Sequence, residues 1–274
     1  MATRPPLVLL PPSEGKAEGG TGPPWRTDRD RANALDRYRL EVLQALVSAM
    51  AAPEAKRAKL LGVKGVALAA ATAANLAVLE SPTGPAIDRY SGVLYEGLDV
   101  TSLTKAHRRR LDGQVFIFSG AFGFVRPAEN IPNYKLKMGA TLVATGKLST
   151  FWRQPITESL APIAAGRTIW NLLPNEHDAA WLPLNRAVRS APRTIVTVRF
   201  VDEVQRKDGR ELVAVAHWNK LLKGALVRHI LATQLADIEG LADFVHPRGY
   251  RFDPELTEQS PDGGRQIAYL VNRA

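Results

Sequence analysis

Cysteine is absent from this chain of 274 residues. Its absence excludes disulfide bonds, cysteine-ligated zinc, iron–sulfur clusters and a thiol nucleophile. The five histidines lack the spacing of a metal site, so we expect no metal and no cofactor. A membrane span needs about 18 consecutive apolar residues, and no stretch of the sequence approaches this length. The N-terminal segment lacks the features of a secretory signal. We therefore expect a cytoplasmic protein without a membrane partner.

Acidic residues are outnumbered: 27 Asp and Glu stand against 36 Lys and Arg, which gives a net charge of +9. Such a surplus favours a polyanionic partner, for example duplex or single-stranded DNA, RNA or a nucleotide. A basic surface without a partner is the alternative. Composition alone does not decide between them.

Hydrophobic patterning predicts one domain over residues 1–274, of the α/β class with mixed α+β character and a mixed central sheet. Strands are expected in the apolar runs 7–10, 115–118 and 168–171, in the alternating stretch 133–142, in a hairpin between 193 and 217, and in 265–273. Helices with one apolar face are expected at about 33–50 and 218–235, and a basic helix is expected at 101–113. No repeat and no clear linker divides the chain.

Three of the predicted strands end in small polar residues. Ser13-Glu14-Gly15-Lys16 follows the first, Ser119-Gly120 the second, and Asn171 with Asn175-Glu176 the third. If these strands are neighbours, their polar ends gather at one edge of the sheet and form a ligand-binding cleft.

The Ser13–Lys16 stretch matches no established phosphate or acyl-enzyme motif. The Walker pattern fails because Leu10 and Ala17 occupy positions that require Gly and Ser or Thr. The Ser-x-x-Lys motif of penicillin-binding enzymes lacks its partner motifs here. Lys16 remains a point charge beside a tight turn and suits an anionic group; a surface turn lysine is the alternative.

Residues 56–75 predict two helices joined by the turn Gly62-Val63-Lys64-Gly65. The turn resembles the Gly-apolar-Gly turn of a helix-hairpin-helix, with one residue more. Backbone amides at such a turn can bind a DNA phosphate, so Gly62, Lys64 and Gly65 are candidate DNA-binding residues. A plain corner between two helices is the alternative.

Glu176 and His177 follow Asn175 directly, and together they could supply a general acid or base. A pair of this kind is more often a capping and surface cluster, which is the interpretation that the sequence favours.

Seven segments occur in the order typical of the YaaA family of peroxide stress proteins: LLPPSEGK, YSGVLYEGL, IFSGAFGFVRPAENIPNYKLKMG, FWRQPIT, WNLLPNEH, NKLLKGAL and GYRFD. The chain therefore resembles this family over almost its whole length. The most specific part is the Ser-Gly-x-x-Gly-x-x-Arg-Pro block with its downstream Tyr-x-x-x-Met-Gly, here Ser119, Gly120, Gly123, Arg126, Pro127, Tyr134, Met138 and Gly139.

The resemblance implies a single-domain fold peculiar to the family, with a positively charged cleft and a helix-hairpin-helix at 56–75. It also implies DNA binding and a cytoplasmic role in peroxide stress that limits iron-driven damage to DNA. The residues that it implies for the cleft are Ser13, Glu14, Lys16, Ser119, Arg126, Tyr134, Lys135, Lys137, Asn171, Asn175, Glu176, Lys220 and Lys223.

Three motifs depart from the family pattern. Glu14-Gly15 replaces the middle of the opening Ser-Pro-Ala-Lys, Pro174 and His177 replace a serine and a tyrosine, and Lys223 replaces an arginine. Lysine and arginine are not equivalent at a bidentate site. These departures indicate a divergent subgroup whose ligand can differ.

Two functions follow from these residues. The first is a DNA-binding stress protein. The second is an enzyme acting on a small anionic or nucleotide-like substrate, for instance in specialised metabolism. In that case Glu176 would be the acid or base, Lys16 and Arg126 would hold the anion, and Tyr134 or Lys220 would assist. An iron-sequestering protein is disfavoured, because no carboxylate or histidine cluster has metal-ligand spacing.

Overall fold

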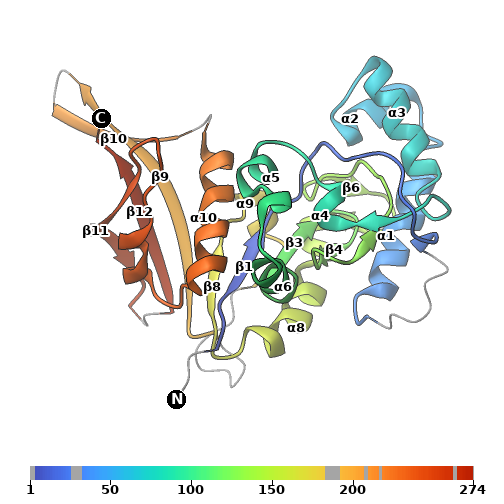
Figure 1. Ribbon diagram of the computed structural model, residues 1–274. Helices are drawn as coiled ribbons and strands as arrows, with labels where there is room; N and C mark the ends of the chain where they lie inside the picture. Colours follow the sequence, from blue (N-terminus) through green and yellow to red (C-terminus); the bar gives the residue numbers. More distant parts are fainter. Residues whose placement is uncertain are drawn as a thin grey trace.

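A large mixed β-sheet runs through the computed structural model, which describes residues 4–25, 33–182, 192–206, 209–215, 218–261 and 264–273 (Figure 1). Eight strands form it in the order β11-β12-β9-β8-β1-β3-β4, with β10 paired to β9. Its strands are β1 (Leu7–Leu10), β3 (Val115–Ser119), β4 (Gly123–Val125), β8 (Thr168–Asn171), β9 (Thr194–Arg206), β10 (Gly209–Ala214), β11 (Arg251–Gln259) and β12 (Arg265–Asn272). The mixed α/β class and the mixed sheet predicted from the sequence are confirmed.

Helices and short strands cover and connect this sheet. The α-helices are α1 (Asp36–Ala49), α2 (Glu54–Leu61), α3 (Gly65–Leu76), α4 (Ala86–Arg89), α5 (Val93–Leu98), α6 (Lys105–Gln114), α7 (Leu148–Phe151), α8 (Arg153–Ala164), α9 (Asn175–Asp178) and α10 (Asn219–Thr233). The 3-10 helices are η2 (Val100–Ser102) and η3 (Ile238–Asp243), and two small ladders pair β2 (Gly84–Pro85) with β5 (Asn130–Ile131) and β6 (Thr141–Leu142) with β7 (Gly146–Lys147).

The centre of the sheet is parallel. β1 pairs with β3 through Leu10 and Ile117 and with β8 through Leu9 and Asn171. Every residue of β1 is fully buried, as expected for a parallel strand with both faces covered. The three strands predicted from apolar runs are therefore neighbours, and their carboxyl ends lie at one edge.

The other end of the sheet is longer and less buried. β9 and β10 form the predicted hairpin, and Asp208 of its Asp-Gly turn lies outside the described residues. β12 runs parallel to β9 and antiparallel to β11, a strand that the sequence did not predict. Figure 1 shows this part of the sheet extending away from the helices that surround β1 and β3.

Helix α10 packs against α5 with the two backbones in contact. A Cβ atom at Gly224 would lie 2.2 Å from the carbonyl oxygen of Leu94, and one at Gly97 would lie 2.6 Å from that of Leu221. Only glycine fits at such a crossing. This crossing brings the first turn of α10, with Lys220 and Lys223, toward the end of β8.

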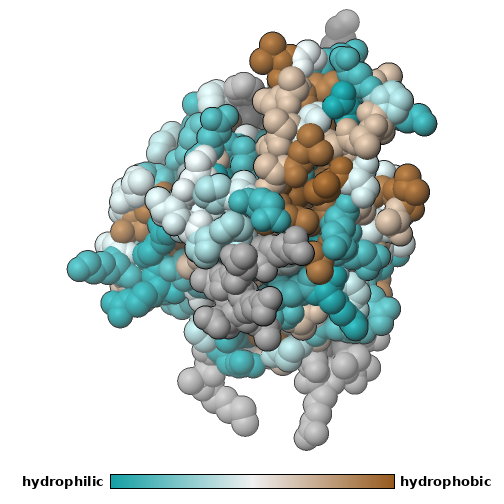
Figure 2. Space-filling view, turned by 90° about the vertical axis from the view of Figure 1, so that its right-hand side faces the viewer, coloured by the Kyte–Doolittle hydropathy of each residue, from teal (hydrophilic) through white to brown (hydrophobic). Residues whose placement is uncertain are grey.

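The predicted pair of helices over 56–75 is present as α2 and α3, which project at the upper right of Figure 1. Gly62 ends α2 in the left-handed region, with φ of 68°. Among the described residues no single helix is long and apolar enough to cross a membrane. Only α2 and α3 taken together have the necessary length and apolar composition, and these two helices are bent by 85° relative to each other. Figure 2 looks at this side of the molecule, where apolar side chains gather beside hydrophilic ones; Val66 and Leu76 of α3 are exposed.

The prediction of a strand over 133–142 is wrong for most of its length, because only Thr141–Leu142 form a strand there. Tyr134, Leu136 and Met138 are buried and alternate with two lysines, which produced the strand-like pattern. The backbone of Lys135 instead bonds to the side-chain amide of Asn75, at 2.8 and 3.0 Å. An extended segment whose backbone is hydrogen-bonded by an amide side chain shows the same alternation of buried and exposed side chains as a strand. The periodicity of the sequence therefore cannot distinguish the two.

Helix α6 also begins later than the expected 101–113. Thr104 caps it by accepting a hydrogen bond from the backbone N–H of His107, and the preceding residues form η2. The other two expected helices correspond to α1 and α10.

Candidate functional site

The carboxyl ends of β8, β1 and β3 meet at one edge of the sheet because β1 pairs in parallel with both neighbours. Polar residues after β1 and β3 lie against the segment 133–139 and against Tyr90, which follows α4. We call these residues the strand-end cluster: Glu14, Lys16, Tyr90, Ser119, Tyr134, Lys135 and Lys137.

A chain of hydroxyl groups forms the buried floor of this cluster. The Ser119 hydroxyl accepts hydrogen bonds from the backbone N–H groups of Ala121 and Phe122, at 3.2 and 3.1 Å. Its own hydrogen is thereby directed to the Tyr134 hydroxyl, 2.6 Å away. The Tyr134 hydroxyl lies 2.7 Å from that of Tyr90. Ser119 therefore donates to Tyr134, and either phenol can be the donor in the Tyr134–Tyr90 hydrogen bond.

Burial keeps both phenols protonated at neutral pH. Desolvation raises the pKa of Tyr134 to about 12, although its hydrogen bonds with Ser119 and Tyr90 act in the opposite direction. Desolvation, and then Tyr134 itself, raise the pKa of Tyr90 well above its usual value. The hydroxyl chain can accordingly donate protons but does not carry a negative charge near pH 7.

Lys16 lies over this floor. Its Nζ is 4.3 Å from the ring centroid of Tyr134 and 5.4 Å from that of Tyr90, and it donates a hydrogen bond of 3.1 Å to the carbonyl oxygen of Ser13. Desolvation lowers the pKa of Lys16 to about 7; the positive charge of Lys135 adds to this, Glu14 opposes it, and Arg89 adds to it again. A lysine with this pKa is partly a neutral amine under physiological conditions.

Glu14 joins the other two lysines of the cluster. Its carboxylate lies 2.9 Å from the Nζ of Lys135 and 3.3 Å from that of Lys137. The hydrogen bond from Lys135 is the main reason why the pKa of Glu14 is lowered. A Cβ atom at Gly62 would lie 3.0 Å from the Nζ of Lys137, so the α2–α3 turn is directly adjacent to the strand-end cluster.

The residues after β8 form a second group. Asn171 donates to Asp178 (2.8 Å), which also accepts from the indole of Trp181 (3.0 Å). Glu176 accepts a hydrogen bond from the backbone N–H of Gly139, where a Cβ atom would overlap the carboxylate. Glu176 is thus a contact between α9 and the loop that carries Tyr134, and Asn175 is exposed at the start of α9.

The expectation that Glu176 and His177 form a surface cluster is wrong for His177, which is largely buried. Both its ring nitrogens are buried and without a hydrogen-bond partner among the described residues. Desolvation lowers its pKa to about 4, so the imidazole is neutral at physiological pH.

The remaining predicted residues lie in different surroundings. The Lys223 ammonium donates to the carbonyl oxygen of Leu172 at 2.9 Å, and burial lowers its pKa to about 8. Lys220 is exposed, and Ser13 is half-buried. The Arg126 guanidinium stacks 4.2 Å from the Phe116 ring centroid and donates to the carbonyl oxygens of Asp112 and Gly113, at the end of α6.

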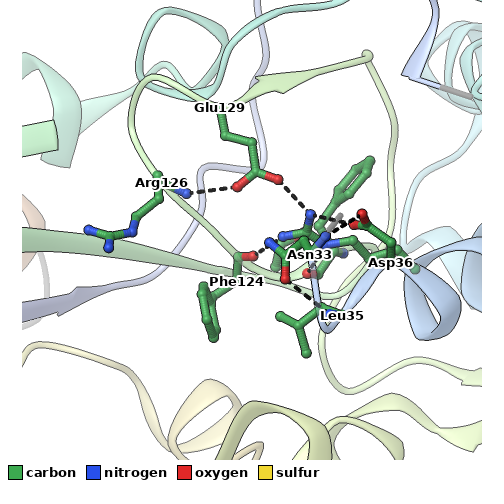
Figure 3. Close-up of polar contacts among 9 residues, drawn as sticks. Asn33, Leu35, Asp36, Phe124, Arg126 and Glu129 are labelled. Carbon is green, nitrogen blue, oxygen red and sulfur yellow. Dashed lines mark hydrogen bonds and ion pairs between the residues drawn. The ribbon is translucent and has the colours of Figure 1, made fainter. Parts of the chain in front are cut away.

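Arg39 supports the cluster and was not predicted from the sequence. It is almost fully buried, and it donates to the carbonyl oxygens of Phe122 (3.0 Å) and Phe124 (2.6 Å). Figure 3 shows the surrounding network: Glu129 reaches the guanidinium on one side and the Arg126 backbone N–H on the other, and Asp36 completes it. Arg39 therefore fixes the turn whose amides bind the Ser119 hydroxyl.

Arg89 and Tyr90 were also missed. The buried Arg89 guanidinium donates to the carbonyl oxygens of Ala17 (2.6 Å) and Ile131 (3.2 and 3.3 Å), so it holds the segment after Lys16 against the loop before Tyr134. The signal available in the sequence was that Tyr90 is the first residue of the YSGVLYEGL segment and that Arg89 directly precedes it.

The protein belongs to the mixed α/β class. The central parallel strands of its sheet end at a cluster of tyrosines and lysines, beside a bent pair of helices. The family follows from comparison: the chain belongs to the YaaA family, because the family model described as peroxide stress protein YaaA matches residues 7–256. The chain is 38% identical to a UPF0246 protein of Streptomyces coelicolor over 262 residues, covering 94% of this chain and 95% of that protein. It is 34% identical to a UPF0246 protein of Corynebacterium glutamicum over 226 residues, which cover 81% of this chain and 83% of that protein.

Proposed function

We propose that this protein binds DNA through the α2–α3 turn together with the lysines of the strand-end cluster. Its role would be to protect DNA under peroxide stress and to limit iron-driven damage there. The observation that carries the proposal is the contact between Gly62 of the turn and Lys137 of the cluster. The two candidate phosphate-binding features thereby form one continuous surface.

The turn has the local features that phosphate binding requires. Lys64 precedes α3 in an extended conformation, and no side chain caps the first amides of this 12-residue helix. Lys64 and Gly65 are exposed, as are Lys56 and Lys59 on α2. Free amides at a helix N-terminus, surrounded by cations, favour a phosphate group.

A salt series of binding to duplex and single-stranded DNA tests this proposal. Lys64→Glu is expected to weaken binding and to reduce the slope of log affinity against log salt, because each neutralised phosphate contributes about −0.9 to that slope on duplex DNA. Lys105→Glu, on the exposed start of α6, is the matched control and leaves the slope unchanged. Absence of binding at low salt would contradict the proposal.

An enzyme acting on a small anionic or nucleotide-like substrate is the second candidate. The hydroxyl chain of Ser119, Tyr134 and Tyr90 under the Lys16 amine favours it, since such a chain can deliver protons. Glu176→Gln should abolish a cellular function that depends on catalysis but spare one that depends on DNA binding alone. Lys64→Glu should have the opposite effect.

A further inference from the structure

The Lys16 amine is placed as a nucleophile rather than as a simple anion-binding cation. An ammonium that only holds an anion is usually strongly hydrated. Lys16 instead has two tyrosine rings beneath it and one carbonyl oxygen as a hydrogen-bond acceptor. A lysine desolvated by apolar surfaces and placed near other cations is the type that forms Schiff bases.

The groups that face Lys16 come from three segments. Glu14 is on its own segment, Arg89 and Tyr90 follow from α4, and Tyr134 and Lys135 come from the loop after β5. Desolvation and the charges of Lys135 and Arg89 favour the neutral amine, whereas Glu14 and the cation–π contacts with the two tyrosine rings favour the ammonium. Lys16 as a whole is half-buried, so part of its side chain faces solvent.

We propose that Lys16 forms an imine with an aldehyde that carries a phosphate group, such as the ring-opened sugar of an abasic site in DNA. The DNA form of this proposal rests on the DNA binding proposed above. A free sugar phosphate has the same aldehyde and phosphate chemistry, and it does not depend on the α2–α3 turn.

Phosphate recognition would come from the neighbouring lysines. Glu14 takes one contact from each of Lys135 and Lys137, and an ammonium has three donors, so both lysines keep N–H groups for a phosphate. Lys137 also adjoins Gly62, so a DNA strand bound at the turn would pass the cluster.

The bond changes balance without an oxidant or a reductant. The lone pair of the Lys16 nitrogen attacks the aldehyde carbon, and the C=O π pair moves to oxygen, which takes a proton. The carbinolamine then loses water as the C=N bond forms, and both amine hydrogens leave with the carbonyl oxygen. The protonated hydroxyl chain from Ser119 through Tyr134 to Tyr90 is the nearby proton donor for the departing oxygen.

Borohydride trapping tests the proposal. The full chain is incubated with a duplex containing one abasic site, sodium cyanoborohydride reduces any imine to a stable amine, and mass spectrometry locates the adduct. We expect an adduct on Lys16. Lys16→Arg should lower its yield by about two orders of magnitude, because the guanidinium stays protonated. Lys105→Arg, on the exposed start of α6, is the matched control and should retain the adduct.

Further arms separate the possible outcomes. A duplex with a tetrahydrofuran analogue has no aldehyde and should bind without forming an adduct. Deoxyribose 5-phosphate replaces the duplex in a parallel reaction, and DNA binding is measured separately by anisotropy. An adduct on Lys16 with the sugar phosphate but not with the duplex supports the imine and assigns it to the free source, even if DNA binding fails.

Two results would overturn the proposal. One is the absence of an adduct with either aldehyde. The other is an adduct that maps to lysines other than Lys16 and persists in Lys16→Arg. Circular dichroism checks that this variant is folded, and Lys16→Gln replaces it if it is not.

Discussion

The centre of the sheet and its outer strands are built differently. In the centre, β8, β1 and β3 are short, parallel and buried, and the cluster residues at their ends are joined by buried hydrogen bonds. In the outer part, the second half of β9 and most of β10 are partly or fully exposed, and their ion pairs, such as Arg206 with Glu211, face solvent. Where water can replace a lost partner, a polar contact contributes little. Removal of a central polar group should therefore cost stability and function together.

The largest effect is expected at Arg39. Arg39→Met would leave Glu129 and two carbonyl oxygens without their buried partner, and breaking a buried ion pair costs about 3–5 kcal/mol. Urea unfolding measures this loss. A loss below about 1 kcal/mol, the range of an exposed pair, would show that the centre does not differ from the outer strands.

The next largest effect is expected at Tyr134. Tyr134→Phe removes the middle hydroxyl of the buried chain and leaves Ser119 without its acceptor, at a cost of about 1–3 kcal/mol. Tyr269→Phe is the control in β12, where the tyrosine is half-exposed and bonds to Glu258. Equal losses in thermal unfolding of the two variants would remove the distinction between the regions.

A pH-dependent effect is expected at His177. Its pKa is lowered to about 4 in the folded chain from 6.5, so the unfolded chain binds more protons between these values. The free energy of unfolding should accordingly rise with pH from about 4 to 6.5 and gain nothing more from this group above that range. His177→Leu should flatten this part of the pH profile, and an unchanged slope would contradict the neutral, buried imidazole.

The smallest effect is expected in the outer hairpin. Arg206 and Glu211 are each mostly exposed, and their pair should contribute about 0–1 kcal/mol. A double-mutant cycle with Arg206→Ala and Glu211→Ala measures the coupling. A coupling of several kcal/mol would show that this hairpin is held as firmly as the centre.

The sequence predicted the parts of the fold that depend on local pattern. The runs at Leu7–Leu10 and Thr168–Asn171 are completely buried strands, and continuous apolar runs report such burial directly. The α2–α3 turn was found because glycines mark the end of one helix and the start of the next. The strand order was not predictable from these patterns, because pairing is a long-range property.

The site was only partly predictable for a physical reason. Ser119, Tyr134 and Lys16 stand out as polar residues after apolar runs or within a motif. Arg39 and Arg89 look like surface cations, and nothing local shows that carbonyl groups far away in sequence surround them. The lowered pKa of Lys16 depends on burial and on the charges of Lys135 and Arg89 from two other segments, so it too appears only in the folded chain.

The central claim is that the α2–α3 turn and the strand-end cluster act as one surface for DNA. The salt dependence of duplex binding by the wild type, Lys64→Glu and Lys137→Gln tests it most directly, with Lys147→Gln on exposed β7 as the control. Lys64→Glu and Lys137→Gln should each reduce the salt slope, and Lys147→Gln should leave it unchanged. Equal slopes for the wild type and Lys137→Gln would contradict it.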